Sequence, residues 1–224
     1  MTPPRAKAAV SRARKRFITR NLATAAFSRV IGRSEGSLTV HAPETTALPR
    51  ILIVTGAMAA GKSTVAQALA ERLPKAVHLR GDVFRRMIVT GRVDPSPGTE
   101  DAWLGQLQLR QTLAVQAAVT YAAAGFSVIY QDILTNALPD ILEDLSGWKP
   151  GVVVLCPRAE TLADRDAARA KTGYVGWTPA AFDAMVRAQT PPVGLWLDNS
   201  DLTPKQTVDH ILQHAAQTRA GIAA

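Results

Sequence analysis

Three features that would each indicate a particular class of protein are missing from this sequence. Its single cysteine, Cys156, excludes a disulfide framework and suits a reducing compartment. No apolar stretch approaches the length of about 20 residues that a membrane-spanning helix needs. His78, His210 and His214 lack further ligands at the spacing of a zinc site, so we interpret them as structural or solvated. What remains is a chain of 224 residues, 47% of them apolar, which is long enough for one well-packed domain and an extension.

Acidic residues are also scarce, but only in the first part of the chain. Residues 1–50 hold ten lysines and arginines against Glu35 and Glu44, whereas residues 51–224 hold sixteen basic and sixteen acidic side chains. The net charge of +8 therefore belongs to the first part, and the rest is neutral. A catalytic domain that binds nucleic acid would usually keep a basic face of its own, so a nucleic-acid partner is expected only through the basic part.

The sequence predicts a basic N-terminal extension and linker over 1–49, a folded domain over 50–218 and a short C-terminal tail over 219–224. Within the extension, residues 6–31 are compatible with a basic amphipathic helix, and residues 32–49 carry the Gly, Ser, Thr and Pro of a linker. A solvated extension, a contact with nucleic acid or an anionic membrane, and a transit-like peptide all fit this composition. The N-terminal extension lacks the apolar core of a secretory signal, and we expect a cytoplasmic protein.

From residue 51 onward, apolar strand patterns alternate with helical patterns. The predicted strands lie at 51–55, 76–80, 126–131, 152–156 and 195–197. The predicted helices lie at 62–73, 83–89, 99–124, 137–145, 159–170, 179–189 and 204–216, and Thr178 and Pro179 begin one of them. Short apolar strands separated by helices predict an α/β fold, in which a five-stranded parallel sheet has helices on both faces.

The end of the first predicted strand carries the most informative motif. Residues 51–54 are apolar, GxxxxGKS follows within two residues, and a helical pattern comes directly after it. This is the pattern of a P-loop, in which glycines permit the turn while amide N–H groups and the helix N-terminus attract phosphate. The predicted nucleotide-binding residues are Gly56, Ala57, Met58, Ala59, Ala60, Gly61, Lys62, Ser63 and Thr64. Lys62 is expected near the β- and γ-phosphates, and the Ser63 hydroxyl is expected to ligate Mg²⁺.

Asp82 narrows the choice among GTPases, motor ATPases and small-molecule kinases, which all share the P-loop. It follows the second predicted strand, and ligands of an open α/β sheet bind at the carboxyl ends of the strands. A carboxylate there can orient an acceptor hydroxyl and take its proton. The alternative is that Asp82 caps a helix that begins at Val83, and the two roles are compatible. Of Arg85 and Arg86, one turn further on, we expect one to reach an anionic group of the substrate and the other to be solvated.

The two motifs resemble those of an AAA-type family of small P-loop phosphotransferases, which includes chloramphenicol phosphotransferase, Zeta toxins and phage-type polynucleotide 5′-kinases. In that family a GKS/T loop is followed by an Asp at a strand end, in a G-D-x-x-R-like setting. The matching residues here are Gly56, Gly61, Lys62, Ser63 and Thr64, then Gly81, Asp82 and Arg85. The resemblance extends along most of residues 51–216. It implies a P-loop kinase fold and a role for Asp82 in activating the acceptor hydroxyl.

Three further residues are candidates for the chemistry. Asp132 ends the third predicted strand, and it is expected to hold Mg²⁺ through water or to contact the acceptor; capping a loop is the alternative. Arg165 and Arg169 share a helix face, and small kinases of this architecture present lid arginines to the transferring phosphate. Surface ion pairs are the alternative, and we expect a lid role for at least one of the two arginines.

The acceptor and the nucleotide base are expected in two other segments. Residues 82–110 mix apolar and basic side chains, including Arg110, and are expected to bind the acceptor. The turn at 198–201 follows the last strand and is a candidate for contacts to the nucleotide base, whereas 171–177 reads as a segment that closes over the substrate.

The sequence therefore predicts an ATP-dependent kinase that moves the γ-phosphate of ATP, with Mg²⁺, to a hydroxyl group of a small molecule. The resemblance implies an antibiotic or a nucleotide sugar as the acceptor. Two alternatives stay open. One is a polynucleotide 5′-hydroxyl kinase that uses its basic extension as a tether, and the other is a nucleotide-binding regulator or toxin-like protein without turnover.

Overall fold

The computed structural model describes residues 47–94, 98–168, 174 and 176–219. The predicted helix over 6–31, nearly all of the linker, Arg169 and the last residues of the tail lie outside this part of the chain. Among the described residues, none of the helices combines the length and the apolar character needed to cross a membrane.

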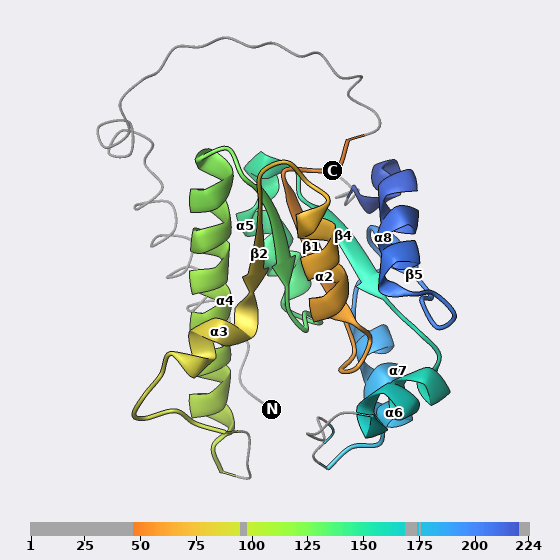
Figure 1. The fold of residues 1–224 in the computed structure, drawn as a ribbon. Helices are drawn as coiled ribbons and strands as arrows, with labels where there is room; N and C mark the ends of the chain where they lie inside the picture. The colour runs from red at the N-terminus through yellow and green to blue at the C-terminus, as the bar shows by residue number, and fades with distance from the viewer. Residues whose placement is uncertain (1–46, 95–97, 169–173, 175, 220–224) are drawn as a thin grey trace, which may run out of the picture. The chain divides into compact units, whose positions relative to one another are not determined.

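A five-stranded parallel sheet forms the centre of the fold (Figure 1). Its strands are β1 (Ile51–Gly56), β2 (Ala76–Arg80), β3 (Ser127–Gln131), β4 (Gly151–Leu155) and β5 (Leu195–Leu197), in the order β2-β3-β1-β4-β5. Every residue of β1 is buried, because this strand lies in the middle of the sheet. All predicted strands are present, and the predicted fold class is confirmed.

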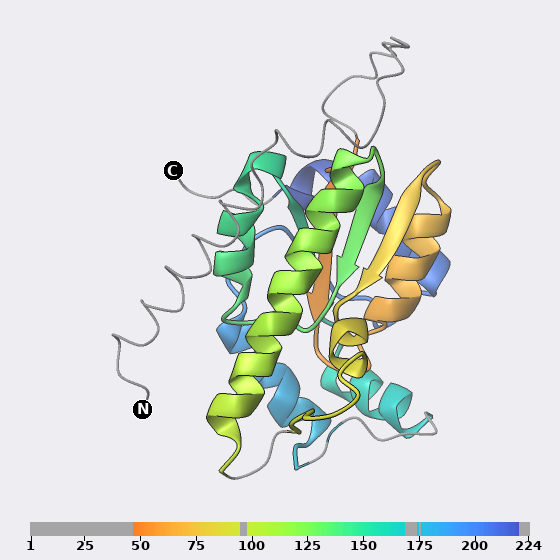
Figure 2. The ribbon, with the colours of Figure 1, turned by 90° about the vertical axis from the view of Figure 1, so that its left-hand side faces the viewer.

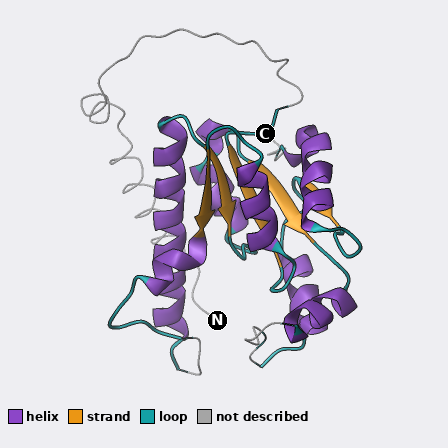
Figure 3. Cartoon of the chain, viewed as in Figure 1, coloured by secondary structure: helices purple, strands orange, loops and turns teal. Residues whose placement is uncertain are grey.

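Helices cover both faces of the sheet, as expected from the sequence (Figure 3). They are α2 (Lys62–Glu71), α3 (Gly81–Arg86), α4 (Glu100–Ala123), α5 (Leu138–Asp144), α6 (Ala159–Ala167), α7 (Pro179–Gln189) and α8 (Pro204–Gln213), with the short 3-10 helices η2 (Ser146–Trp148) and η3 (Ala215–Thr218). The long helix α4 lies across one face together with α5 (Figure 2), and α2 and α8 pack on the other. Helices α6 and α7 lie at the end where the strands finish (Figure 1).

Side chains of the strands alternate between two apolar clusters, one on each face. In β3, Val128 and Tyr130 pack with residues of α4 and α5, whereas Ile129 packs with residues of α2 and α8. Successive residues of a strand point to opposite faces, so Gln131 and Asp132, at the end of β3, are directed toward different helices. This alternation determines which of them reaches the P-loop.

Several helix boundaries differ from the prediction by one to three residues, and those of α3 matter most for the site. Helix α3 begins at Gly81, not at Val83, and ends at Arg86. The residue before its first turn is therefore Arg80, so the interpretation of Asp82 as the capping residue is wrong. The predicted helix over 204–216 ends at Gln213 and continues as the 3-10 turn η3.

Two helix starts follow the sequence. The Thr178 side chain accepts a hydrogen bond from the Ala181 N–H at the start of α7, with Pro179 as the first helical residue. Thr203 and Gln206 form a reciprocal capping box at the start of α8. These caps fix the residues at which α7 and α8 begin.

Candidate active site

The loop between β1 and α2 has a backbone path that requires glycine at both ends. Gly56 has a φ of 136°, and a Cβ there would overlap the carbonyl oxygen of Leu155 in β4. Gly61 has a φ of 92°, in the left-handed region, directly before α2. Ala59 also has a positive φ, 62°, which costs energy for a residue with a Cβ and is common at functional sites. The spacing of the two glycines therefore fixes the course of the loop.

Lys62 begins α2 and folds back over the loop. The residue is only 8% exposed, and its Nζ donates a hydrogen bond of 2.7 Å to the carbonyl oxygen of Ala57. The ammonium group thus lies inside the curve formed by residues 57–60. A phosphate oxygen would be a stronger partner for this charge than a neutral carbonyl, because hydrogen bonds between ions are stronger.

Ser63 points toward the end of β3. Its Oγ donates to Gln131 Oε1 over 3.0 Å, and Gln131 is 8% exposed. The side chain that contacts the P-loop serine is therefore a neutral amide. Sequence reasoning gave Gln131 no role. The alternation of β3 could have indicated one, because residue 131 lies on the same face of the sheet as Ile129, which packs with residues of α2.

Asp82 lies in the first turn of α3, directly after β2. Its side chain is 46% exposed, and Oδ2 accepts a hydrogen bond of 2.8 Å from Arg86 Nη2, one turn further along the helix. The Arg80 Nε lies 3.7 Å from the other oxygen, Oδ1. Two arginines therefore flank a carboxylate at the carboxyl end of β2, in which Oδ1 is buried while the side chain as a whole is partly exposed.

Asp132 is buried on the α4 side of the sheet. Its Oδ1 accepts a hydrogen bond of 2.9 Å from Arg110 Nη2 and one of 2.8 Å from the Ile133 N–H. Burial raises the pKa of this carboxyl, while Arg110 and Lys62 act against that shift and Asp82 adds to it. The carboxyl group thus lies within electrostatic reach of both the P-loop lysine and Asp82.

Arg85 and Arg86 point in different directions. Arg85 forms an ion pair with Asp94 and donates to the carbonyl oxygen of Val93 over 3.4 Å. Arg86, with 56% of its side chain exposed, lies beside Asp82. The expectation that one of them reaches an anionic group of the substrate stays a prediction, and Arg86 is the one next to the candidate catalytic carboxylate.

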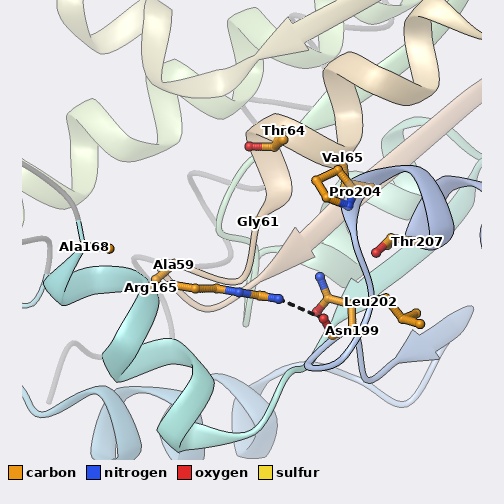
Figure 4. Close-up of a pocket in the computed structure, with 10 residues that line it drawn as sticks. All are labelled: Ala59, Gly61, Thr64, Val65, Arg165, Ala168, Asn199, Leu202, Pro204 and Thr207. Atoms are coloured by element: carbon orange, nitrogen blue, oxygen red, sulfur yellow. Dashed lines mark hydrogen bonds between the residues drawn. The ribbon is translucent and has the colours of Figure 1, made fainter.

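A cavity of about 310 Å³ lies on the other side of the P-loop (Figure 4). Its walls are formed by Ala59, Gly61, Thr64, Val65, Arg165, Ala168, Asn199, Leu202, Pro204 and Thr207. Arg165 extends from α6 across this space, and its Nη2 donates to the carbonyl oxygen of Asn199 over 2.9 Å (Figure 4). The Asn199 Nδ2 donates to Ala60 O over 3.1 Å, and its buried Oδ1 has no hydrogen-bond partner within the described residues.

The cavity brings together residues that the sequence analysis had assigned to different tasks. Arg165 came from the predicted lid, and Asn199 from the predicted base-contact turn. Both lie beside Thr64, at the end of the P-loop. Arg169, the second predicted lid arginine, lies outside the described residues.

Tyr174 contacts the P-loop from the segment that was expected to close over the substrate. Its Oη donates to the carbonyl oxygen of Met58 over 2.5 Å, and the residue is 6% exposed. The ring packs edge-on against Phe182 of α7, with centroids 5.6 Å apart, and Trp177 packs edge-on against the same ring at 5.9 Å. Sequence reasoning included Tyr174 in this segment but gave it no role of its own, because nothing local indicates that it contacts the P-loop.

A second hollow, of about 440 Å³, lies between α2 and the edge strand β2 and is lined by Ser63, Thr64, Gln67, Ala68, Glu71, His78 and Arg80. The His78 Nδ1 lies 2.9 Å from Gln67 Oε1. Burial lowers the pKa of His78, and the charge of Arg80 acts in the same direction, whereas Gln131 and Asp82 act in the opposite direction. This hollow borders the P-loop serine on the face of the sheet that carries α2.

The described residues thus place three kinds of group at one end of the sheet: a loop shaped for phosphate, a serine hydroxyl, and a carboxylate that a substrate can reach. A family model described as an AAA domain matches residues 51–192. No curated protein gives a significant match to the chain.

The fold is similar to that of several solved structures. The tunicamycin resistance protein of Deinococcus radiodurans has a TM-score of 0.57 and 17% identity, over 78% of this chain and 99% of that chain. Shikimate kinase from Acinetobacter baumannii, solved with shikimate, has a TM-score of 0.52 and 20% identity, over 75% and 93% of the two chains. A sugar kinase from Janibacter sp. HTCC2649 has a TM-score of 0.51 and 20% identity, over 73% and 92%. At these identities the likeness establishes the fold, which is that of P-loop kinases.

Proposed function

This chain belongs to the AAA-domain family whose model matches residues 51–192, and from its site we propose that it transfers the γ-phosphoryl group of ATP to a hydroxyl group of a small molecule. The observation that carries the proposal is the position of Asp82. Its side chain is 46% exposed, although Oδ1 is buried, and it plays no capping role. It lies at the end of β2, where both it and Lys62 are within electrostatic reach of Asp132. A phosphate loop next to an accessible carboxylate is the arrangement that phosphoryl transfer to an alcohol requires.

The P-loop would hold the triphosphate of the nucleotide. Amide groups along the path that Gly56 and Gly61 define would donate to the phosphates, and the N-terminus of α2 adds a partial positive charge. Lys62 would exchange the carbonyl oxygen of Ala57 for a phosphate oxygen and offset the charge that develops during transfer. The nucleoside would lie in the cavity beside Asn199 and Arg165. There the Asn199 Oδ1, which has no hydrogen-bond partner in the part of the chain that the structure describes, can accept a hydrogen bond from a base.

The chain offers Ser63 as its ligand for magnesium. The Ser63 hydroxyl fits such an ion because it is a hard oxygen ligand at the start of α2, and Gln131 already orients it. When bound, Mg²⁺ would supply positive charge that offsets the negative charge of the phosphates. Gln131 would keep the hydroxyl directed at that position by accepting its hydrogen bond.

Asp82 would prepare the acceptor. It would accept a hydrogen bond from the acceptor hydroxyl and take its proton as the oxygen bonds to phosphorus. Arg86 and Arg80 would hold the carboxylate in place. The acceptor would then lie over residues 82–110, and we propose that the catalytic domain extends over 50–218.

The named neighbours support a small alcohol as the acceptor. One is a shikimate kinase, one is a sugar kinase, and one is named for resistance to tunicamycin. An antibiotic or a nucleotide sugar remains our proposed acceptor class. The neutral charge of residues 51–224 favours such a molecule over a nucleic acid, although the basic extension keeps a polynucleotide 5′-hydroxyl kinase as a second candidate.

The decisive experiment measures ADP release with magnesium and ATP in the presence of hydroxylated antibiotics, nucleosides, sugars and a 5′-hydroxyl oligonucleotide. We expect one small alcohol to stimulate release, and Asp82→Asn to reduce that rate at least about 100-fold without weakening ATP binding. Asp140→Asn is the matched control, because Asp140 is also an exposed aspartate in the first turn of a helix, α5. Full activity of Asp82→Asn would overturn the proposal.

Deletion of residues 1–45 separates the two acceptor classes. A small-molecule kinase should keep its rate after this deletion, because the proposed catalytic residues all lie beyond the deleted part. A polynucleotide kinase that depends on the basic extension should lose binding to the oligonucleotide, with a steep dependence on salt in the parent.

A further inference from the structure

The two residues at the end of β3 serve opposite sides of the site. Gln131 faces α2 and accepts the hydrogen bond of Ser63, whereas Asp132 faces α4 and forms an ion pair with Arg110. The main chain of this turn is tied to the sheet, because the Asp132 N–H donates to the carbonyl oxygen of Val54 over 3.3 Å. The carboxylate therefore does not share the face on which the P-loop serine lies.

The ion pair between Asp132 and Arg110 is almost completely shielded from solvent. Only 6% of the Asp132 side chain and 14% of the Arg110 side chain are exposed, and the two atoms lie 2.9 Å apart. Burying such a pair costs desolvation energy that its attraction only partly returns, so stability alone gives little reason to retain it. A buried pair with no gain in stability is better explained by the geometry that it maintains.

That geometry concerns Gly81, the residue directly before Asp82. A Cβ on Gly81 would overlap Asp132 Oδ2, and the next nearest atoms are the Cγ and Cβ of the same aspartate. Asp132 Oδ2 is buried and has no hydrogen-bond partner among the described residues. The Oδ2 of Asp132 thus packs directly against Gly81, in the first turn of α3. Its other oxygen, Oδ1, accepts hydrogen bonds from Arg110 and from the Ile133 N–H.

We propose that Asp132 is a positioning residue for Asp82: held by Arg110, it sets the backbone at Gly81 and so aims the Asp82 carboxylate at the acceptor hydroxyl. This rests on the proposed function, because it takes Asp82 as the group that receives the proton. It differs from the sequence expectation that Asp132 belongs to the magnesium shell. On this proposal magnesium depends on Ser63 and Gln131, and the Asp132–Arg110 pair acts only on the acceptor side.

The test compares Asp132→Asn and Gly81→Ala in the full chain. The first leaves Arg110 without its charged partner, and the second places a methyl group where Oδ2 lies. Both should lower kcat about 100-fold, since a misplacement of about 1 Å costs that much. The KM for ATP and the magnesium concentration for half-maximal binding of a fluorescent ATP analogue should stay within about twofold of the parent. Gly147→Ala in η2 is the matched control, since no atom lies near a Cβ there, and it should match the parent.

A double variant shows whether Asp132 acts through Asp82. In the background of Asp82→Asn, the change Asp132→Asn should cause no further loss of the residual rate, because the group that it positions is already disabled. An additional loss as large as in the parent would overturn the proposal.

Three other results would also overturn it. A decrease of about tenfold in magnesium affinity of Asp132→Asn would place the residue in the metal shell. A lower melting temperature with an unchanged kcat would make its role structural, and an unchanged kcat in Gly81→Ala would remove the link to Asp82.

Gly81→Ala decides the question even where Asp132→Asn does not fold. If Asp82→Asn itself is fully active, the proposed function fails; if only the Asp132 and Gly81 variants are fully active, this inference alone fails.

Discussion

The two sides of the site are held together by different kinds of interaction. On the α2 side the hydrogen bonds described above end on neutral acceptors: Ser63 donates to Gln131, and Asn199 and Lys62 donate to carbonyl oxygens of the loop. On the α4 side they are ion pairs: Arg110 with Asp132, Arg86 with Asp82, and Arg85 with Asp94. On the phosphate side the acceptors are thus neutral groups of the loop and its neighbours, whereas on the acceptor side, side chains of opposite charge are paired.

This difference predicts how each side of the site should respond to an increase in salt concentration. A loop whose path is set by glycine geometry should change little with salt, because among the described residues hydrogen bonds and not ion pairs maintain it. Exposed ion pairs weaken as salt screens them, and the buried pair of Asp132 and Arg110 is screened much less. Ranked by expected effect, four substitutions test this contrast.

Lys62→Ala should have the largest effect. It removes the ammonium group that bonds back to the P-loop at Ala57, and we expect kcat/KM to fall about 100- to 1000-fold, because a donor to the transferring phosphate is lost. The measurement is ADP release under saturating acceptor, with magnesium–ATP binding measured in parallel. Lys75→Ala is the control, since Lys75 packs over Phe126 and bonds to Ala124 O near the start of β2. Parent-like activity of Lys62→Ala would contradict the assignment of the loop.

Gln131→Leu tests the neutral contact to the P-loop serine. Leucine cannot accept the hydrogen bond of Ser63, so the hydroxyl loses its orientation, and the apparent affinity for magnesium should fall about tenfold. Magnesium titration in the presence of a fluorescent ATP analogue gives the value. Gln213→Leu, at the exposed end of α8, should leave it unchanged. An unaltered magnesium affinity in Gln131→Leu would mean that the contact does not orient the ligand.

Arg86→Met tests the exposed ion pair on the acceptor side. The side chains of Arg86 and Asp82 are 56% and 46% exposed, so the free energy of unfolding should change by less than about 1 kcal/mol. We expect kcat to fall by less than about tenfold, because Arg80 still lies near Asp82. Raising the salt concentration should reduce the parent rate toward that of the variant. A salt-independent difference would show that Arg86 does more than steady the carboxylate.

His78→Gln should have the smallest effect, visible only as a change in pH dependence. Burial and Arg80 lower the pKa of His78 below 6.5, so protonation costs more in the folded protein than in the unfolded chain. The stability of the parent is therefore complete above the unfolded value and decreases as the pH falls through the folded pKa. Gln67, Gln131 and Asp82 are the other groups that face the ring. Melting temperatures between about pH 7 and pH 5 should decline less steeply in the variant; equal slopes would contradict the shift.

Local motifs were predictable because their determinants are adjacent in sequence. The P-loop needs only the strand, the two glycines and the helix that follows, and every strand of the sheet was found from its apolar run. The pairing of Ser63 with Gln131 was not predictable in this way, because 68 positions separate them and only the register of β3 brings them together. Arg110 was expected at the acceptor, and its contact with Asp132 depends on how α4 is rotated about its axis.

The start of α3 shows why a boundary was missed. Glycine is a poor helix former, so the sequence placed the start at Val83. In the structure Gly81 begins the helix because only a residue without a side chain fits against Asp132. A tertiary contact therefore overrides the local preference, and it moves Asp82 from a capping position into the first turn.

The edge-on stack of Tyr174, Phe182 and Trp177 gives the P-loop an optical reporter. Tyr174 bonds to the main chain of the loop at Met58, and Trp177, half exposed, lies at the far end of the stack. A ligand that displaces the Met58 carbonyl must also tilt the tyrosine ring and, through Phe182, change the polarity around the indole. The intrinsic emission of Trp177 would then follow occupancy of the loop without any added dye.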